Sequence, residues 1–402
     1  MSNNELNIWL LSNESQAEKN FYSSLFSEFA AEHGIEIKYK RFAWPRAFSN
    51  LIDSYRNGNP PDIFQMGTTW LRTLARMGYV TEVPEEIERE PLTGWIKDCC
   101  MFENKRVALP WHIEVRSILV NNTLAERYSI DIEKIKTWDD FHGICTQIAE
   151  RKMSEPEAPI PVMLPIRPEF GTLNLYMAWL YSGGWRFPSL DSATDKIVSD
   201  NSFVEKFDFL PQLIDSCNID FADLKKPPSV LYEQFAEARF IFYMGNWVNK
   251  SYGETLNNDV YSIMPLPVAG GNWRRWGGGS VLCVSSESKL PRLSWKLIER
   301  ITSEEVVAEW VKASGELPSF NCQFWEEYMD DDNVKTIYKL AKQSAPYPFH
   351  SLWYRMEKVL SEGITDYLWT VMENPQMTVE EKKSYLQEID EKLINIISLT
   401  WV

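Results

Sequence analysis

The chain has 402 residues, of which 44% are hydrophobic and 24% are charged, and its formal net charge is −16. A chain of this length is too long to fold around a single hydrophobic core, so two domains are expected. No apolar run reaches the ~18 residues that a membrane-spanning helix needs. An acidic surface does not attract phosphate, which argues against general binding to nucleic acid and to anionic membranes.

The first elements in chain order form a βαβ unit. The apolar run 6–11 predicts a strand, and the pair Ser15 and Glu18 is a capping-box pattern that begins a helix. Gly34 is expected to end this helix, and the alternating segment 35–42 predicts a second strand.

The same alternation of strands and helices continues along the chain. Helices are expected at 47–56 and 69–77, with a turn that leads into a strand over 60–66 between them, and Thr137 is expected to cap another helix. This order predicts an α/β fold with parallel sheets, and the chain after Pro318 is expected to be mainly helical.

No long linker divides the chain, so the two lobes are expected to be discontinuous in sequence. Three extended segments are expected to cross between them, at 118–121, 260–267 and 315–318. The predicted N-terminal lobe comprises 1–119 plus 265–318, and the predicted C-terminal lobe comprises 120–264 plus 319–402. A ligand cleft is expected between the lobes, which a multi-strand hinge joins.

The chain contains 17 Trp, and several lie beside Gly, Pro, Asn or Arg, where a pocket wall is expected rather than a helix core. Flat indole faces stack on the apolar face of a sugar ring, while its hydroxyl groups reach nearby polar side chains. These segments favour a carbohydrate ligand and are Trp44-Pro45-Arg46, Pro110-Trp111-His112, Gly184-Trp185-Arg186, Gly245-Asn246-Trp247 and Trp273-Arg274-Arg275-Trp276-Gly277.

A series of short segments also follows a recognisable order over roughly residues 7–370. They include Asn7-Ile8-Trp9, Pro60-Pro61-Asp62-Ile63-Phe64-Gln65, Trp70-Leu71-Arg72-Thr73-Leu74, Ala108-Leu109-Pro110-Trp111, Thr137-Trp138-Asp139-Asp140-Phe141, Gly245-Asn246-Trp247, Met264-Pro265-Leu266-Pro267 and Gly277-Gly278-Gly279-Ser280. In this order the chain resembles the extracellular solute-binding proteins of sugar ABC transporters, the family that includes maltose-binding protein.

This resemblance implies the type II, two-lobed periplasmic-binding-protein fold. It also implies a non-catalytic receptor that closes around a mono- or oligosaccharide and delivers it to the permease subunits of an ABC transporter. A monomer without cofactor or metal is expected, in the periplasm or at the outer face of a membrane. No signal-peptide pattern is visible, so a cytoplasmic location is expected if Met1 is the native start.

The sharpest candidate site is the segment 111–116. In the resembling family, a Pro-Trp pair followed three residues later by an acid brings an indole and a carboxylate into the cleft, which here implies Trp111 and Glu114. Alternation along an extended segment places His112, Glu114 and Arg116 on one face. The alternative interpretation is a surface ladder of ion pairs.

Other ligand contacts are expected from loops at strand ends in both lobes. For the N-terminal lobe they are Asn13, Glu14, Trp44, Arg46, Gln65 and Trp70. For the C-terminal lobe they are Glu169, Trp185, Asn246, Trp247 and Trp353, and near the return to the first lobe Trp276, Gly278 and Gly279, where a glycine run lets backbone N–H groups approach a ligand. For Asn13 and Glu14 a plain helix-entry loop, and for Trp44, Trp70 and Trp353 simple packing, remain alternatives.

Two other functions remain open. A glycoside hydrolase would need a pair of carboxylates, but no pair lies at strand ends in the order that a (β/α)₈ barrel needs. A ligand-sensing module of the same fold without a permease would fit the missing signal pattern and the six cysteines, which read mostly as small buried hydrophobes. The net charge disfavours polyanionic ligands, although uronic or sulfated sugars stay open because of Arg46, Arg116, Arg186, Arg274 and Arg275.

Overall fold

The structure is a computed structural model, and it describes residues 4–11, 15–152, 154–155, 157–190, 196–246, 260–271 and 273–399. The strands are β1 (Glu5–Leu11), β2 (Glu36–Phe42), β3 (Ile63–Gly67), β4 (Met101–Phe102), β5 (Lys105–Arg106), β6 (Leu109–Asn121), β7 (Ile160–Met163), β8 (Phe240–Asn246), β9 (Tyr261–Pro265), β10 (Arg275–Val284), β11 (Leu317–Pro318) and β12 (Ser344–Ala345). One sheet has the order β2-β1-β3-β10-β6-β8-β7, and β9 and β11 pair with β6 while β12 pairs with β10.

Helices cover both ends of this sheet. They are α1 (Gln16–His33), α2 (Trp44–Arg56), α3 (Leu71–Arg76), α4 (Gly94–Cys99), α5 (Asn122–Arg127), η1 (Ile132–Lys134), α6 (Trp138–Arg151), α7 (Phe170–Ser182), α8 (Asn201–Phe207), α9 (Phe209–Ser216), α10 (Phe221–Leu224), α11 (Pro228–Ala236), α12 (Pro291–Ile301), α13 (Glu304–Ser314), α14 (Gln323–Glu327), α15 (Asp332–Gln343), α16 (Trp353–Glu373) and α17 (Val379–Ser398). Within the described ranges, none of them has the length and apolar character needed to cross a bilayer.

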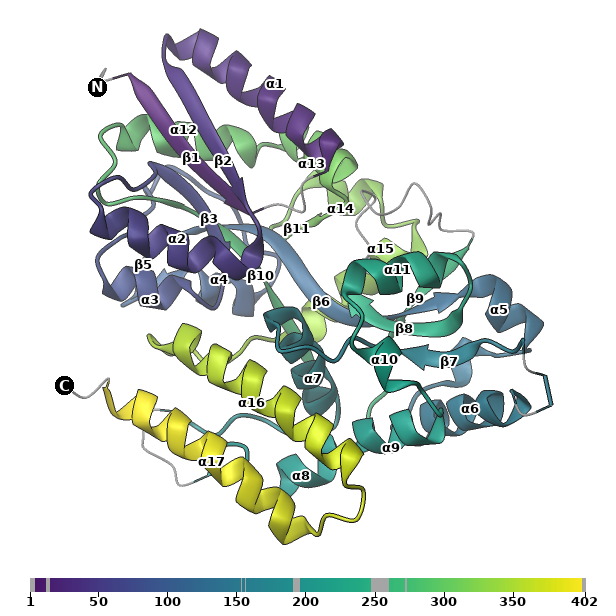
Figure 1. Cartoon of the computed structure of the whole chain (residues 1–402). Coiled ribbons are helices and arrows are strands. Elements are labelled where there is room, and N and C mark those ends of the chain that lie inside the picture. Colours follow the sequence, from purple (N-terminus) through teal and green to yellow (C-terminus); the bar gives the residue numbers. More distant parts are fainter. Residues whose placement is uncertain are drawn as a thin grey trace.

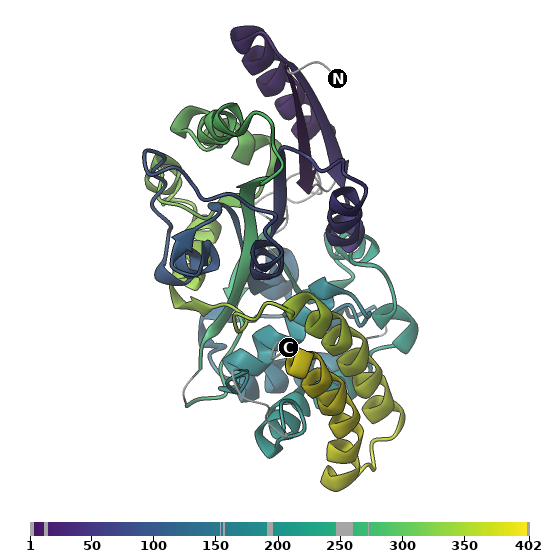
Figure 2. The same cartoon turned by 90° about the vertical axis from the view of Figure 1, so that its left-hand side faces the viewer.

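The molecule has two halves, which Figure 1 shows one above the other. The upper half contains β1–β3 with α1, α2, α12 and α13, and the lower half contains β7–β9 with α5–α9, α16 and α17. Both views show α16 and α17 side by side on the lower half (Figure 2). The two halves therefore combine segments that are distant in sequence.

The long strand β6 runs from one half into the other. Its first part pairs with β10, ending at the pair Val115 and Gly277, and its second part pairs with β8, beginning at Arg116 and Asn246. Strand β10 also pairs with β3, through Ser280 to Val284. These two strands are thus the backbone connection at the centre of the molecule.

The start of the chain folds as the sequence predicts. The Ser15 hydroxyl accepts a hydrogen bond from the backbone N–H of Glu18 at the start of α1, and Gly34 ends the helix with a φ of 62°, a left-handed conformation that favours glycine. Thr137 and Asp140 form a reciprocal capping box at α6. Local signals of this kind depend only on neighbouring residues, so they are readable from the sequence.

The expectation of parallel sheets is wrong for the centre of the sheet. Strands β1, β2 and β3 are parallel, as are β7 and β8, but β10 is antiparallel to both β3 and β6. The central strands connect the two halves and do not follow a helical crossover within one half. Their direction is therefore set by the long-range path of the chain and not by local βαβ units.

Hydrophobic side chains are buried on both faces of the upper strands. Leu6, Ile8 and Leu10 of β1 point into a cluster that includes Trp111 and Trp310, whereas Leu11 faces a second cluster with Phe48 and Trp70. A larger cluster fills the lower half. All six cysteines are free thiols and five of them are buried, as the sequence predicts.

Candidate functional site

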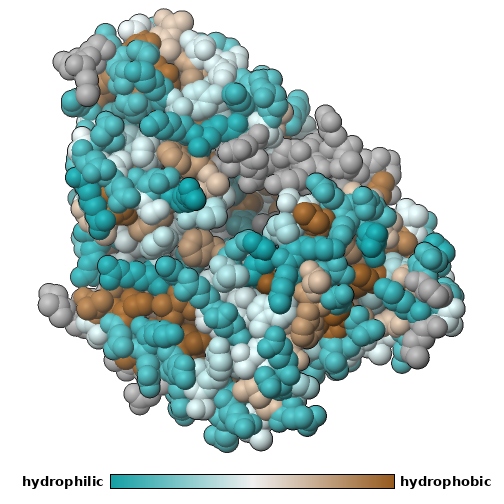
Figure 3. Space-filling model, viewed as in Figure 1, coloured by the Kyte–Doolittle hydropathy of each residue, from teal (hydrophilic) through white to brown (hydrophobic). Residues whose placement is uncertain are grey.

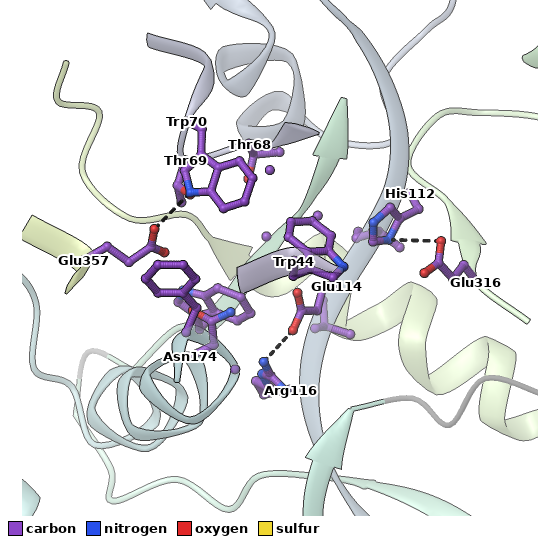
Figure 4. A pocket seen from close by; sticks show the side chains of 18 of the residues that line it. Trp44, Thr68, Thr69, Trp70, His112, Glu114, Arg116, Asn174, Glu316 and Glu357 are labelled. Carbon is purple, nitrogen blue, oxygen red and sulfur yellow. Dashed lines mark hydrogen bonds and ion pairs between the residues drawn. The ribbon is translucent and has the colours of Figure 1, made fainter. Parts of the chain in front are cut away.

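A pocket of about 410 Å³ lies at the junction of the two halves, and the surface is hollowed there (Figure 3). Its walls come from the starts of α2 and α7, the turn after β3, the centres of β6 and β10, and α16. Figure 4 shows these side chains converging from opposite sides. The site is therefore built by segments far apart in the sequence.

Aromatic rings form one wall of the pocket. Trp44 begins α2, where the following Pro45 fixes the backbone at the helix start, and its ring meets Trp70 edge to face with centroids 5.6 Å apart. Both indoles approach Gly67 closely, because a Cβ atom there would lie 3.2 Å from the Trp44 ring and 3.6 Å from Trp70. Phe170, at the start of α7, lies beside Trp70 from the lower half.

Strand β6 supplies the polar floor. His112, Glu114 and Arg116 all line the pocket, in agreement with the alternation that the sequence predicts for an extended segment. Arg116 Nη2 and Glu114 Oε1 are 2.5 Å apart, and the Arg116 guanidinium also lies over the Trp276 ring. The ion pair that the sequence analysis gives as an alternative to a binding site is therefore itself part of the pocket wall. It holds the Glu114 carboxylate and the Arg116 guanidinium at fixed positions in the pocket.

The glycine run of β10 brings backbone into the pocket. Gly278 and Gly279 line it, together with the ring of Trp276, which is only 3% exposed. Gly279 has a φ of +147°, and a Cβ atom there would lie 2.1 Å from the carbonyl oxygen of His112. Only glycine fits at this point between β10 and β6.

Two carboxyl groups, one buried and one partly exposed, lie at opposite ends of the pocket (Figure 4). Glu357 of α16 accepts a hydrogen bond of 3.2 Å from Trp70 Nε1, and burial raises the pKa of its carboxyl to about 8. Glu316 lies just before β11, and burial raises its pKa to about 8, with the charges of Glu18 and Glu114 adding to the effect.

His112 lies 3.9 Å from Glu316, measured from Nδ1 to a carboxylate oxygen. Burial lowers the pKa of His112 to about 4, so its imidazole is neutral at pH 7. Burial raises the pKa of Glu316 and lowers that of His112, so both shifts favour the neutral forms and weaken the ionic attraction across this contact.

Several polar atoms at the pocket lack a hydrogen-bond partner. Within the described part of the chain they include His112 Nε2, Arg116 Nε and Trp276 Nε1. Buried polar groups without a partner are costly, and ligand binding is a common way to satisfy them. Among the same described residues, no three His, Cys, Asp or Glu side chains are grouped so that they could hold a metal ion.

The structure brings together eight of the residues that the sequence nominates. These pocket-lining residues are Trp44, Trp70, Glu114, Arg116, Glu169, Trp276, Gly278 and Gly279. Glu169 lies at the start of α7 and pairs with Arg167 at 2.6 Å. The sequence leaves open whether Trp70 contacts a ligand or only packs in the core. In the structure it lines the pocket and also packs against Phe48.

Trp111 lies outside the pocket. Its side chain is 1% exposed and packs against Trp310, with ring centroids 4.0 Å apart. The reason is the alternation of β6, which points His112 toward the pocket and the preceding residue toward the opposite face. The indole expected in the cleft is therefore part of the hydrophobic core.

Four other nominated residues also lie away from the pocket lining. Gln65 is buried in β3 and bonds to the Leu11 amide and to Ser280, and Arg46 is exposed on α2. Trp185 donates a hydrogen bond to Asp200 within the lower core. Trp353 is 1% exposed and stacks on Tyr347, which agrees with the packing alternative.

Three nominated positions are not described. Asn13, Glu14 and Trp247 lie outside the described residues, and Asn246 is the last residue of β8, with its side chain outside the description. Their part in a site remains a prediction.

The sequence analysis missed the acids Glu316 and Glu357. Glu316 belongs to a segment recognised only as a crossing between lobes, although its neighbour Gly315 shows that the chain turns there. Glu357 lies on the apolar side of α16, beside the buried Met356 and Leu360. An acid within the apolar stripe of a helix is a readable signal of a buried polar site.

Known proteins share this architecture. The sequence model of the bacterial extracellular solute-binding protein family matches residues 24–322. The diacetylchitobiose-binding protein DasA of Streptomyces coelicolor is 22% identical over 326 residues, which cover 78% of this chain and 73% of that protein.

Solved structures agree with the fold. An ABC transporter solute-binding protein of Thermotoga lettingae, bound with α-D-tagatose, has a TM-score of 0.80 at 18% identity and covers 98% of this chain and 100% of that chain. The sugar-binding protein MalE of Xanthomonas citri has a TM-score of 0.77 at 16% identity, covering 98% of each chain. The predicted α/β, two-lobed periplasmic-binding-protein fold is confirmed.

Proposed function

The chain belongs to the bacterial extracellular solute-binding protein family, and from this premise we propose that it is a non-catalytic carbohydrate receptor. It binds a mono- or oligosaccharide in the pocket between the two halves and closes around it. The observation that carries this proposal is the pairing of Trp44 and Trp70 with the Glu114–Arg116 ion pair in one cavity. The aromatic rings can stack on the apolar face of a sugar, and the charged groups can form hydrogen bonds with its hydroxyl groups.

The ligand contacts that we propose are the eight nominated residues that line the pocket together with His112, Glu316 and Glu357. A volume of about 410 Å³ is in the range of small-molecule sites. The relatives support a sugar as the ligand class, since one is a diacetylchitobiose-binding protein and another holds tagatose. The family and the structural neighbours are binding proteins, which supports a receptor and not an enzyme.

For the lobes we propose the division 1–119 plus 265–318 and 120–264 plus 319–402. The change of partner strands along β6 supports a hinge near Val115 and Arg116. Closure about such a hinge would enclose the ligand and present the closed form to the permease subunits of an ABC transporter, with the receptor acting as a monomer outside the cytoplasmic membrane.

A thermal-shift screen tests the receptor proposal. The purified protein is heated with neutral, acidic and basic mono- and oligosaccharides, with amino acids and polyamines as other ligand classes. A ligand at a hundredfold excess over Kd stabilises the folded state by about 2.7 kcal/mol, which raises Tm by several degrees. A response to one sugar class supports the proposal, whereas a response to amino acids or polyamines alone contradicts it.

Trp44 provides a specific test of the binding wall. Replacing Trp44 with alanine removes a half-buried ring from the pocket, and we expect sugar affinity to fall about thirtyfold, or ~2 kcal/mol. Trp369→Ala is the matched control, because Trp369 is a half-buried tryptophan of α16 that contacts Phe221 and does not line the pocket. Calorimetric titration of both variants measures the difference, and equal losses in the two would argue against sugar stacking on Trp44.

A further inference from the structure

Acidic groups outnumber basic ones among the pocket-lining residues. Four carboxyl groups line the cavity, from Glu114, Glu169, Glu316 and Glu357, whereas Arg116 is the single Lys or Arg in the described lining. Carboxylates are common in sugar sites because they accept hydrogen bonds from hydroxyls. This excess also means that the cavity has more acids than cations to balance them whenever the acids ionise.

Basic partners account for two of the four acids. Arg116 pairs with Glu114 at 2.5 Å, and Arg167 pairs with Glu169 at 2.6 Å. No Lys or Arg of the described chain lies within ion-pair distance of Glu357 or Glu316. Glu357 is 3% exposed and accepts a hydrogen bond from the neutral indole of Trp70. Glu357, which is buried, and Glu316, which is partly exposed, thus have no basic partner in the described part of the chain that would balance their charge when they ionise.

We propose that the ligand is an amino sugar with a free ammonium group, and that this group binds at Glu357. The proposal rests on the receptor function proposed above and specifies its ligand class. The ammonium would supply the charge that Glu357 lacks, while the sugar oxygens would accept hydrogen bonds from Arg116 Nε and Trp276 Nε1, the unpartnered donors of the pocket. The ligand therefore carries both a cationic group and acceptor atoms.

The surroundings of Glu357 suit a cation. Trp70, which donates to Glu357, lies within an aromatic group that includes Phe170 and Tyr354. Aromatic faces attract ammonium groups when water is excluded, by about 2 kcal/mol in favourable cases. A neutral sugar would donate a hydroxyl hydrogen bond to the Glu357 carboxylate but would leave the charge of this acid uncompensated.

An acidic sugar fits the pocket poorly. Of the five arginines that the sequence offers for such a ligand, only Arg116 lines the cavity, and Glu114 already pairs with it. A uronate or sulfate would therefore meet carboxyl groups without a free cation to receive it in the described lining. This arrangement argues against the uronic or sulfated sugars that the arginines leave open from sequence alone.

Ammonium binding also changes the protonation of Glu357. Because burial raises the pKa of this carboxyl to about 8, it is mostly protonated at pH 6.5 in the free protein. An adjacent ammonium favours the carboxylate and lowers that pKa, so the carboxyl proton passes to the buffer when the ligand binds. A neutral sugar has no such effect, which gives the two ligand classes different signatures.

A matched set of β-1,4-linked disaccharides tests the proposal. Cellobiose, di-glucosamine and diacetylchitobiose share one skeleton and carry a hydroxyl, an ammonium or an acetamide group at each C2 position. Glucose, glucosamine and N-acetylglucosamine form the corresponding set of single rings. By calorimetric titration at pH 6.5, we expect the ammonium form to bind at least tenfold more tightly than the hydroxyl form, and to release protons when the titration is repeated in buffers of different ionisation enthalpy.

The variant Glu357→Gln should lower the affinity for the ammonium form at least tenfold more than the affinity for the hydroxyl form, and it should abolish the proton release. Glu373→Gln, an exposed acid at the other end of α16, is the control and should change neither ligand. Circular dichroism establishes that both variants fold, and the proton release of the unmodified protein is measured independently of either variant.

The two proposals can fail separately. If neutral or acetylated sugars bind as tightly as the ammonium form, or the ammonium form binds without proton release, the amino-sugar proposal is wrong and the receptor proposal stands. If no sugar of either set or of the wider panel binds, both proposals fail.

Discussion

Replacing Gly279 with alanine is expected to lower the free energy of unfolding by about 3–5 kcal/mol, the largest effect of any single substitution considered. The added Cβ atom would lie 2.1 Å from the His112 carbonyl oxygen, and the φ of +147° disfavours any other residue. Neither side can yield easily, because the Cβ atom is fixed to the backbone of β10 and the carbonyl oxygen belongs to the backbone of the paired strand β6.

The same substitution should also disturb the pocket. Gly279 lines the cavity, and its carbonyl accepts a hydrogen bond of 3.0 Å from the Thr68 amide in the turn after β3. Gly94→Ala is the matched control, since Gly94 is exposed at the start of α4 and a Cβ atom there meets nothing within 4 Å. Denaturant unfolding of both variants measures the effect, and similar stabilities would contradict the close approach of β10 and β6.

Stability is expected to fall as the pH rises from 6.5 to 8. In the folded protein burial raises the pKa of Glu357 and of Glu316 to about 8, whereas in the unfolded chain both acids ionise near 4.5. The folded state therefore holds protons that the unfolded state has lost, and this stabilisation is complete below pH 4.5 and disappears as the pH passes 8. His112 is neutral in the folded protein throughout this window, whereas in the unfolded chain it is about half protonated at pH 6.5, so it opposes the decline by only about 0.4 kcal/mol.

The size of the effect follows from about 1.4 kcal/mol for each pKa unit. Over this window Glu357 alone contributes about 2 kcal/mol, and Glu316 contributes less because 22% of its side chain remains exposed. Unfolding free energies at pH 6.5 and 8 should show a decline that Glu357→Gln reduces and Glu373→Gln leaves intact. A wild-type decline that Glu357→Gln does not change would mean that this acid is ionised in the folded protein.

Much of the fold can be predicted from the sequence where the signal is local. The Ser15 cap, the Gly34 end of α1 and the Thr137 capping box require only residues within a few positions of one another. Strand alternation likewise places His112, Glu114 and Arg116 on one face. The order of strands at the centre of the sheet, by contrast, depends on pairings between residues more than a hundred positions apart.

The site is less readable because its parts come from many segments. Trp111 and Trp44 both lie next to proline, yet one packs against Trp310 in the core and the other faces the cavity. The residues next to the two tryptophans in sequence do not distinguish these environments. The environments depend on the helices and strands that pack against each indole. Conversely, Glu357 gives a usable signal in the helix pattern, but its proximity to Trp70 appears only when α16 returns to the start of α3.

A crystal structure of the protein with its tightest-binding sugar tests the central claim most directly. We expect the sugar in the cavity at the junction of the two halves, with a ring against Trp44 and polar contacts to Glu114 and Arg116. A sugar bound outside this cavity, for example in the surface cleft between α1 and β2 that Phe26, Ile37 and Tyr39 line, would contradict the account.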